Sequence, residues 1–248
     1  MNLHPSTQTC LYAHNSLLDK FIDLYNKDKL PNKIILSGEK GIGKSTLAYH
    51  LINYILSKNE EFSYDLINYQ ISSENKSFKL LQNHVNPNFY LIDVLKDKKN
   101  IDINQIRNLI LDLNKSSFNF KPRFVVIDNI ELLNINSINA LLKVLEEPNY
   151  NVNFILINNN KRVLPTLKSR CLNFKVFISY DETIKIINKL LDNDIFNLIN
   201  KELLNNYVTP GQLFKMVKFA NDQKIDLRNI KLKDFLFKVI KNKIYKKD

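Results

Sequence analysis

Five short apolar runs alternate with amphipathic stretches over the first 178 residues of the chain. Each run has the length of a buried strand, and one of them, Arg-Phe-Val-Val-Ile-Asp, is apolar enough to be covered on both faces. Strands that alternate with helices predict an α/β fold, in which a parallel five-stranded sheet is flanked by helices. The predicted strands are residues 33–37, 88–95, 123–128, 152–158 and 171–177.

The amphipathic stretches between these runs predict helices. Residues 46–57 carry an apolar stripe at helical spacing, and His50 lies on that stripe, so we expect a core or edge residue rather than a catalyst. Asp102 is the predicted N-cap of a second helix, and Pro148 marks the end of a third. Residues 58–86, in contrast, are polar and irregular.

The strand pattern stops near Tyr180, and the remainder of the chain is typical of three or four helices with an interruption at residues 209–211. We therefore expect three parts in the chain. They are an α/β domain over residues 1–178, a small all-helical lid over 179–220, and a short helical tail with a basic end over 221–248.

Composition narrows the class of protein. The hydrophobic fraction of 44% supports a sizeable core, and no apolar run approaches the length of a membrane span. The net charge of +11 favours anionic partners, nucleic acid first, although a merely solvated lysine-rich surface would give the same number. Two cysteines, Cys10 and Cys171, are too few for a disulfide framework or a four-cysteine zinc site. With no secretory signal pattern at the N-terminus, we expect a cytoplasmic protein without a membrane anchor.

Candidate chemistry begins at residues 38–45, Gly-Glu-Lys-Gly-Ile-Gly-Lys-Ser, which match the P-loop template at every fixed position. A strand before the loop and a helix after it aim the helix N-terminus at phosphate, whereas a chance match would lack these flanks. We expect ATP or ADP as the ligand, with Lys44 at the β- and γ-phosphates and the Ser45 hydroxyl on Mg²⁺. The predicted nucleotide contacts in this segment are Gly38, Gly41, Ile42, Gly43, Lys44, Ser45 and Thr46.

A second candidate lies at the end of the third strand. Asp128 is placed to hold the Mg²⁺ of a bound nucleotide, the Walker B role; its alternative is to cap the next turn. The next residue, Asn129, cannot accept a proton from an attacking water. Glu131 would have to swing in from the start of a helix. We therefore expect sound nucleotide binding and slow intrinsic hydrolysis.

Two further sites are less specific by themselves. One of the three asparagines at 158–160 is expected to sense the γ-phosphate, Asn159 narrowly ahead of Asn158, although three consecutive asparagines also suit an ordinary turn. Arg170 precedes the last strand and can project from the domain into a neighbour's nucleotide site, but a lone surface arginine is usually only solvated.

Taken together, five segments resemble the AAA+ subunits of the bacterial DNA polymerase III clamp loader, the delta-prime subunit family in particular. They cover roughly residues 30–178, and the most specific are Ala-Leu-Leu-Lys-Val-Leu-Glu-Glu-Pro and Ser-Arg-Cys. The segments are residues 30–38, 101–107, 125–128, 139–148 and 164–171.

This resemblance implies an AAA+ fold and a place in a heteropentamer that opens a sliding clamp and closes it on primed DNA. It implies a stator whose Arg170 acts in trans as an arginine finger at the ATP site of an adjacent motor subunit. The implied partners are the motor and delta-like subunits, the sliding clamp indirectly, and primed DNA through the basic surface.

The chain departs from the family pattern in three places. Residues 58–90 contain no cysteines, so the zinc site of many relatives is not implied. Gln212 stands where a sensor arginine often follows the Pro-Gly step, and we expect the C-terminal helical collar to be truncated. Two alternatives remain: an active motor subunit of the gamma/tau type, which Asn129 disfavours, and a small-molecule kinase, which would need a cluster of phosphate-gripping arginines.

Overall fold

The computed structural model describes residues 3–96, 98–116, 119–147, 151–204 and 208–241. The expected helix stop at Pro148 and the basic end of the tail at 242–248 lie outside these residues. Contacts divide the chain into two compact units. The first unit comprises Met1–Glu39 and Gly43–Phe177, and the second comprises Lys40–Ile42 and Ile178–Asp248.

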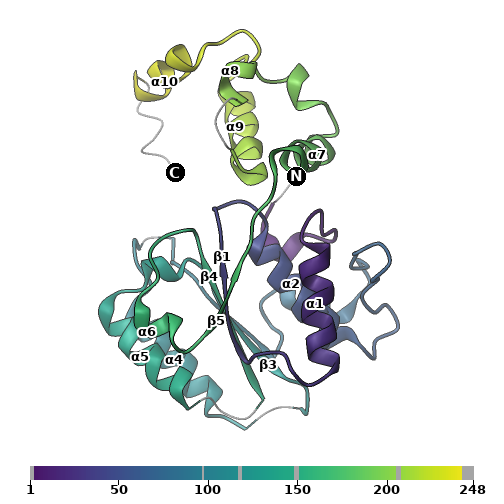
Figure 1. Cartoon of the computed structure of the whole chain (residues 1–248), viewed down its shortest axis with the longest axis vertical. Coiled ribbons are helices and arrows are strands. Elements are labelled where there is room, and N and C mark those ends of the chain that lie inside the picture. Colours follow the sequence, from purple (N-terminus) through teal and green to yellow (C-terminus); the bar gives the residue numbers. More distant parts are fainter. Residues whose placement is uncertain (1–2, 97, 117–118, 148–150, 205–207, 242–248) are drawn as a thin grey trace. The chain divides into compact units, whose positions relative to one another are not determined.

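A five-stranded parallel sheet forms the centre of the first unit, as the apolar runs predict (Figure 1). Its strand order is β2-β3-β4-β1-β5, so β2 and β5 are the edges. Both edge strands are shorter than the runs 88–95 and 171–177, because an edge strand pairs on one side only. The strands are β1 Lys33–Ser37, β2 Phe89–Ile92, β3 Arg123–Ile127, β4 Val152–Asn158 and β5 Leu172–Lys175.

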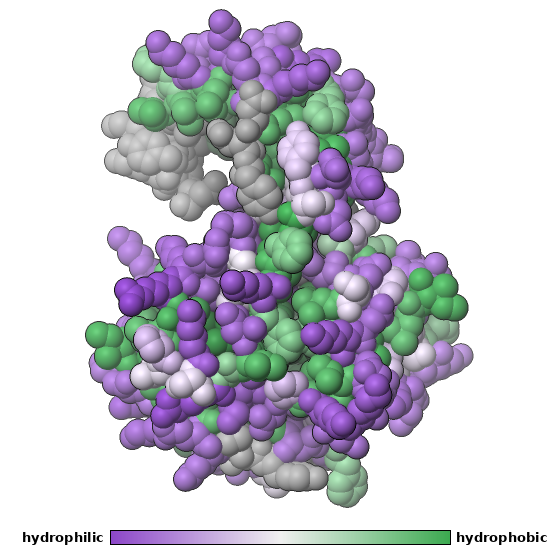
Figure 2. Space-filling model, viewed as in Figure 1, coloured by the Kyte–Doolittle hydropathy of each residue, from purple (hydrophilic) through white to green (hydrophobic). Residues whose placement is uncertain are grey.

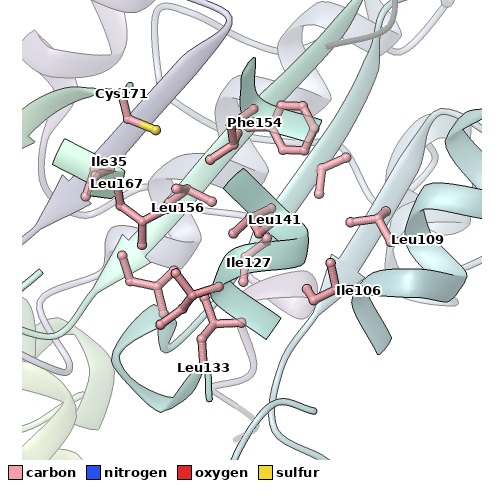
Figure 3. Close-up of a cluster of buried hydrophobic side chains, with 14 of the residues drawn as sticks. Ile35, Ile106, Leu109, Ile127, Leu133, Leu141, Phe154, Leu156, Leu167 and Cys171 are labelled. Carbon is pink, nitrogen blue, oxygen red and sulfur yellow. The ribbon is translucent and has the colours of Figure 1, made fainter. Parts of the chain in front are cut away.

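Helices cover both faces of this sheet. In Figure 1, α1 and α2 lie on one side, and α4, α5 and α6 lie on the other. Figure 3 shows side chains of α4 and α5 meeting those of β3 and β4 in a buried cluster that includes Leu109, Leu141, Ile127 and Phe154. The helical segments of the first unit are η1 Pro5–Thr7, α1 Asn15–Asn26, α2 Lys44–Ser57, α3 Lys76–Gln82, α4 Ile103–Leu113, η2 Ile130–Leu132, α5 Ile135–Glu146 and α6 Pro165–Lys168.

Local signals account for several of these helices. Asp102 caps α4 in a capping box with Gln105, as its position predicts. His50 lies on the inner face of α2 with no exposed surface, and its Nδ1 is 2.8 Å from the Tyr64 hydroxyl oxygen. It is therefore a core residue.

One expectation about this unit is wrong. Residues 58–86 are not irregular throughout, because they contain α3, which Asn75 caps by accepting a hydrogen bond from the Phe78 N–H. A seven-residue helix spans too few turns to give a clear period, and tertiary burial of Phe78 and Leu81 stabilises it instead.

The second unit is helical, and α7 packs against α9. The expected interruption at 209–211 is the start of α9: Thr209 is its N-cap and Pro210 occupies its first turn. Gln212 completes a capping box by accepting from the Thr209 N–H at 2.9 Å. The elements are α7 Tyr180–Leu191, η3 Ile195–Asn197, α8 Lys201–Leu204, α9 Pro210–Asp222 and α10 Leu232–Lys241.

Residues 40–42 belong to the second unit, to which hydrogen bonds connect their carbonyl groups. The Gly211 N–H donates to the Gly41 carbonyl at 3.0 Å, and the Thr209 hydroxyl donates to the Lys40 carbonyl at 2.8 Å. The split of the remainder into a lid over 179–220 and a tail over 221–248 stays a prediction.

One face of the molecule can be compared with the composition. Figure 2 shows hydrophilic residues over most of the viewed face, with hydrophobic residues interspersed among them. Within the described ranges, no helix combines the length and the apolar character that crossing a bilayer requires.

Candidate functional site

Three loops meet at the carboxyl edge of the sheet. The register pairs Ser37 of β1 with Asn158 of β4, and Ile127 of β3 with Leu156 of β4. Because these strands are parallel neighbours, the residues that follow each of them leave the sheet at the same edge. Ligands of open α/β sheets bind at this edge.

The loop after β1 has the backbone that a phosphate cradle needs. Gly41 and Gly43 have φ angles of +90° and +92°, a region that side chains other than glycine rarely adopt. Gly43 is the N-cap of α2, which has neither a side-chain cap nor an acidic residue in its first turn. The first-turn N–H groups of this 14-residue helix, including that of Thr46, suit an anion.

The other predicted loop residues anchor this backbone. The Gly38 N–H donates to the Asn158 carbonyl at 3.2 Å, which ties the start of the loop to β4. The Ile42 side chain is 2% exposed and is therefore packed into the protein rather than presented to solvent.

Lys44 lies inside the loop. Its side chain is buried, and Nζ donates to the carbonyls of Gly38 at 2.8 Å and Glu39 at 2.6 Å and to Oδ1 of Asn159 at 3.0 Å. All three acceptors are uncharged. The positive charge of Lys44 also acts on the Asp128 carboxyl, whose pKa it lowers against the larger opposite effect of burial. Phosphate oxygens are acceptors that suit a buried ammonium group of this kind.

Ser45 and Asp128 form the second part of the site. The Ser45 hydroxyl donates to Oδ2 of Asp128 at 2.7 Å, and the Asn129 N–H donates to Oδ1 at 2.8 Å. Burial raises the pKa of Asp128 above its usual value. Hydroxyl and carboxylate oxygens are suitable ligands for Mg²⁺, which takes further oxygens from phosphates and water. The donor set therefore fits a magnesium–nucleotide complex.

Asn159 joins the two halves of the site. Its Nδ2 donates to Oδ1 of Asn129 at 2.8 Å and to Oε1 of Glu131 at 3.0 Å, while its Oδ1 accepts from Lys44. Asn158, in contrast, is buried and donates to the Lys161 carbonyl. Asn160 contacts Glu39. Of the three asparagines, Asn159 is thus the one whose side chain reaches the P-loop lysine.

The Glu131 carboxylate also belongs to this network. Its Oε2 accepts from the Asn159 N–H at 3.3 Å. The cause is Asn129, whose φ of +55° turns the chain directly from β3 into η2.

Asp93 is a site residue that sequence reasoning missed. Its Oδ1 accepts from Nδ2 of Asn129 at 2.7 Å, and together with Asp128 it raises the pKa of the buried Tyr49 hydroxyl, for which burial is the larger cause. The predicted strand 88–95 ran past this position, whereas β2 ends at Ile92. The available sequence signal for this site residue was an acidic residue near the end of an apolar run.

Arg170 is not part of this network. It follows α6 and precedes β5, whose first residue, Leu172, pairs with Ile34 near the start of β1. Arg170 therefore lies at the amino edge of the sheet, opposite the P-loop. Cys171 beside it is buried, and burial raises the pKa of its thiol to about 11.

Among the described residues, no group of three histidine, cysteine, aspartate or glutamate side chains is arranged to hold a metal ion. The Mg²⁺ considered above would therefore depend on oxygens of the nucleotide and of water in addition to Ser45 and Asp128.

A family of known proteins matches most of the first unit. A family model described as DNA polymerase III, delta subunit, matches residues 13–177. The delta' subunit of DNA polymerase III from Pseudomonas aeruginosa is 31% identical over 139 residues, which are 56% of this chain and 40% of that protein. The gamma/tau subunit from Mycoplasma genitalium is 32% identical over 163 residues, 65% of this chain and 26% of that protein.

A solved structure shows the fold alone. The RuvB Holliday junction branch migration motor of Thermotoga maritima is 17% identical, with a TM-score of 0.50, and covers 91% of this chain and 70% of that one. The chain spans about a quarter to a half of the length of the curated relatives it matches. Because the family model matches more than half of the chain, the chain belongs to the family that the model describes, DNA polymerase III, delta subunit.

Proposed function

We propose that this protein is a delta-prime-like stator of the bacterial clamp loader, which helps to load the sliding clamp onto primed DNA during replication. It binds ATP or ADP with Mg²⁺, hydrolyses ATP weakly, and donates Arg170 in trans to the ATP site of a neighbouring motor subunit. Its delta-prime relatives support the subunit type.

The observation that carries the proposal is the separation between the P-loop site and Arg170. The P-loop site lies at the carboxyl edge of the sheet, and Arg170 lies at the amino edge. An arginine at that position cannot serve the nucleotide of its own chain. It is available to an adjoining subunit, where an arginine finger accelerates hydrolysis by roughly 10³–10⁵.

Nucleotide binding rests on the residues of the network. The loop backbone and Lys44 hold the phosphates, and Ser45 and Asp128 hold Mg²⁺, which neutralises phosphate charge when bound. The bond between Asn159 and Lys44 supports a role for Asn159 at the γ-phosphate. Asn129 leaves the position after Asp128 without a proton acceptor, which supports slow hydrolysis.

The proposed partners are the motor and delta-like subunits, with the sliding clamp contacted through the assembly and primed DNA attracted by the net charge of +11. Replication subunits act on the chromosome, so we place the protein in the cytoplasm.

The test is reconstitution of the purified chain with the remaining clamp-loader subunits. We expect a stable complex on size exclusion that binds the clamp and hydrolyses ATP when primed DNA is added. Failure to associate with the motor subunit would contradict the stator role.

An active motor subunit is the second candidate, because gamma/tau relatives match at similar identity. Steady-state phosphate release by the isolated chain separates the two functions. Turnover on the order of 1 s⁻¹, which is typical of a working enzyme, would favour the motor.

A further inference from the structure

Within the part of the chain that the structure describes, four acidic side chains contact residues of the candidate nucleotide site, and their partners differ. Asp128 accepts from Ser45, Asp93 accepts from Asn129, and Glu39 contacts Asn160. Glu131 alone among the four accepts from Asn159, the residue that holds Lys44.

We propose that Glu131 is the catalytic base of this site, which accepts the proton of the attacking water when bound ATP is hydrolysed. The inference rests on nucleotide binding as proposed above. It assigns to Glu131 the task that Asn129 cannot perform, because an amide does not accept a proton at neutral pH.

The backbone places Glu131 there. Asn129 adopts the left-handed conformation, and η2 begins at the next residue. Ile130 and Leu133 on either side are 4% and 7% exposed, so both are anchored in the core. Glu131 between them is partly exposed, and its side chain points back to the end of β4.

A chain of hydrogen bonds links Glu131 to the P-loop lysine. Glu131 is one hydrogen bond from Asn159 and two from Lys44 Nζ. Asp93, the competing carboxylate, reaches Asn159 only through Asn129 and is therefore one bond further from Lys44. A γ-phosphate held by Lys44 and Asn159 would lie next to the Glu131 carboxylate.

The reaction is the hydrolysis of a phosphoanhydride. The water oxygen bonds to the γ-phosphorus, and the bond from that phosphorus to the β–γ bridging oxygen breaks. The electron pair of the broken bond leaves with ADP, and the water proton passes to Glu131. The products are ADP and inorganic phosphate, so no further reactant is needed.

Single-turnover hydrolysis of ATP by the full chain tests this assignment in the wild type, Glu131→Gln and Asp93→Asn. General-base removal costs about 10²–10⁴-fold, so we expect Glu131→Gln to fall to the buffer rate. Asp93→Asn, the matched loss of a carboxylate from the same network, should lose less than about tenfold.

Equilibrium binding supplies a readout other than activity. ADP should bind Glu131→Gln within about threefold of wild type, and a non-hydrolysable ATP analogue should bind up to about tenfold tighter, because a negative charge beside the γ-phosphate is gone. Weaker binding of both nucleotides would mean that Glu131 only holds the Asn159 side chain in position. That result would overturn the proposal.

Three other results would overturn it: Glu131→Gln as fast as wild type, a larger loss in Asp93→Asn, or a wild type that binds ATP but hydrolyses it no faster than buffer. These outcomes are separate from failure of the proposed function. A chain that hydrolyses ATP through Glu131 but does not join the clamp loader would refute the stator and leave this inference intact.

Discussion

Arg170 is held by Glu146 in the isolated chain. Its Nε donates to Oε1 of Glu146 at 2.9 Å, and Nη2 contacts the same oxygen. Nη1 donates to the Thr166 carbonyl at 3.1 Å. The guanidinium is about one-third exposed and Glu146 is half exposed, so this ion pair is at the surface and contributes at most about 1 kcal/mol. A bond of that strength orients the arginine and still allows it to leave for a stronger anion.

Substitution Arg170→Ala should leave the fold and nucleotide binding intact, because the lost ion pair is weak. In the reconstituted complex, DNA-stimulated hydrolysis at the neighbouring site should fall by about 10³-fold or more. Phosphate release by the complex measures this. Arg228→Ala is the matched control, since Arg228 is an exposed arginine paired with Asp226. An unchanged rate for Arg170→Ala would remove the finger assignment.

Substitution Lys44→Ala should abolish nucleotide binding by this subunit while affecting clamp loading only mildly. The reason is that Lys44 is the buried cation of the loop. Saturating ADP and Mg²⁺, at about 100 times the dissociation constant, should stabilise the wild type by about 2.7 kcal/mol and the variant not at all. Thermal unfolding with and without nucleotide measures the difference.

The control for Lys44→Ala is Lys40→Ala, which removes an exposed lysine at a variable position of the same loop. It should keep the full stabilisation by ADP. Collapse of clamp loading in Lys44→Ala would show that nucleotide at this subunit is more than structural.

Removal of Mg²⁺ should weaken nucleotide binding through Asp128. We expect a chelator to lower the affinity of wild type for ADP about tenfold, because Ser45 and Asp128 then lose the cation that bridges them to the phosphates. Asp128→Asn should bind ADP equally with and without the chelator. Titration calorimetry measures both, and an Asp128→Asn variant that keeps its Mg²⁺ dependence would place the metal elsewhere.

Acid should destabilise the protein through His50. Burial lowers the pKa of this histidine from 6.5 to about 4. Above pH 6.5 neither state binds the proton; between pH 6.5 and 4 the unfolded chain takes it up and the folded chain does not. The free energy of unfolding therefore falls by about 3 kcal/mol as the pH falls through this window.

Urea unfolding at a series of pH values measures that slope. His50→Gln should flatten most of it. The remainder comes from His84, whose pKa burial also lowers, and from Asp128, whose raised pKa acts in the opposite direction. Tyr64→Phe removes the hydroxyl 2.8 Å from His50 Nδ1 and keeps the imidazole, so it should retain the slope. A His50→Gln protein with the wild-type slope would contradict the assignment.

Much of the site was predictable because its signals are local. Residues 38–45 carry glycines where the backbone needs positive φ, and the apolar runs around them identify the strands that position the loop. Asn159 was preferred over Asn158 only narrowly, since alternation along a strand does not say which residue at its end turns toward the neighbouring loop. The bond to Lys44 makes that distinction.

The parallel sheet, the P-loop and the position of Asp128 could be predicted from the sequence, because burial patterns and glycine placement act within a few residues. The places of Glu131 and Asp93 in the network, and of Arg170 at the opposite edge of the sheet, became known from the folded chain. Those facts depend on strand order and on one left-handed residue, Asn129, and strand order arises from contacts between segments far apart in the chain.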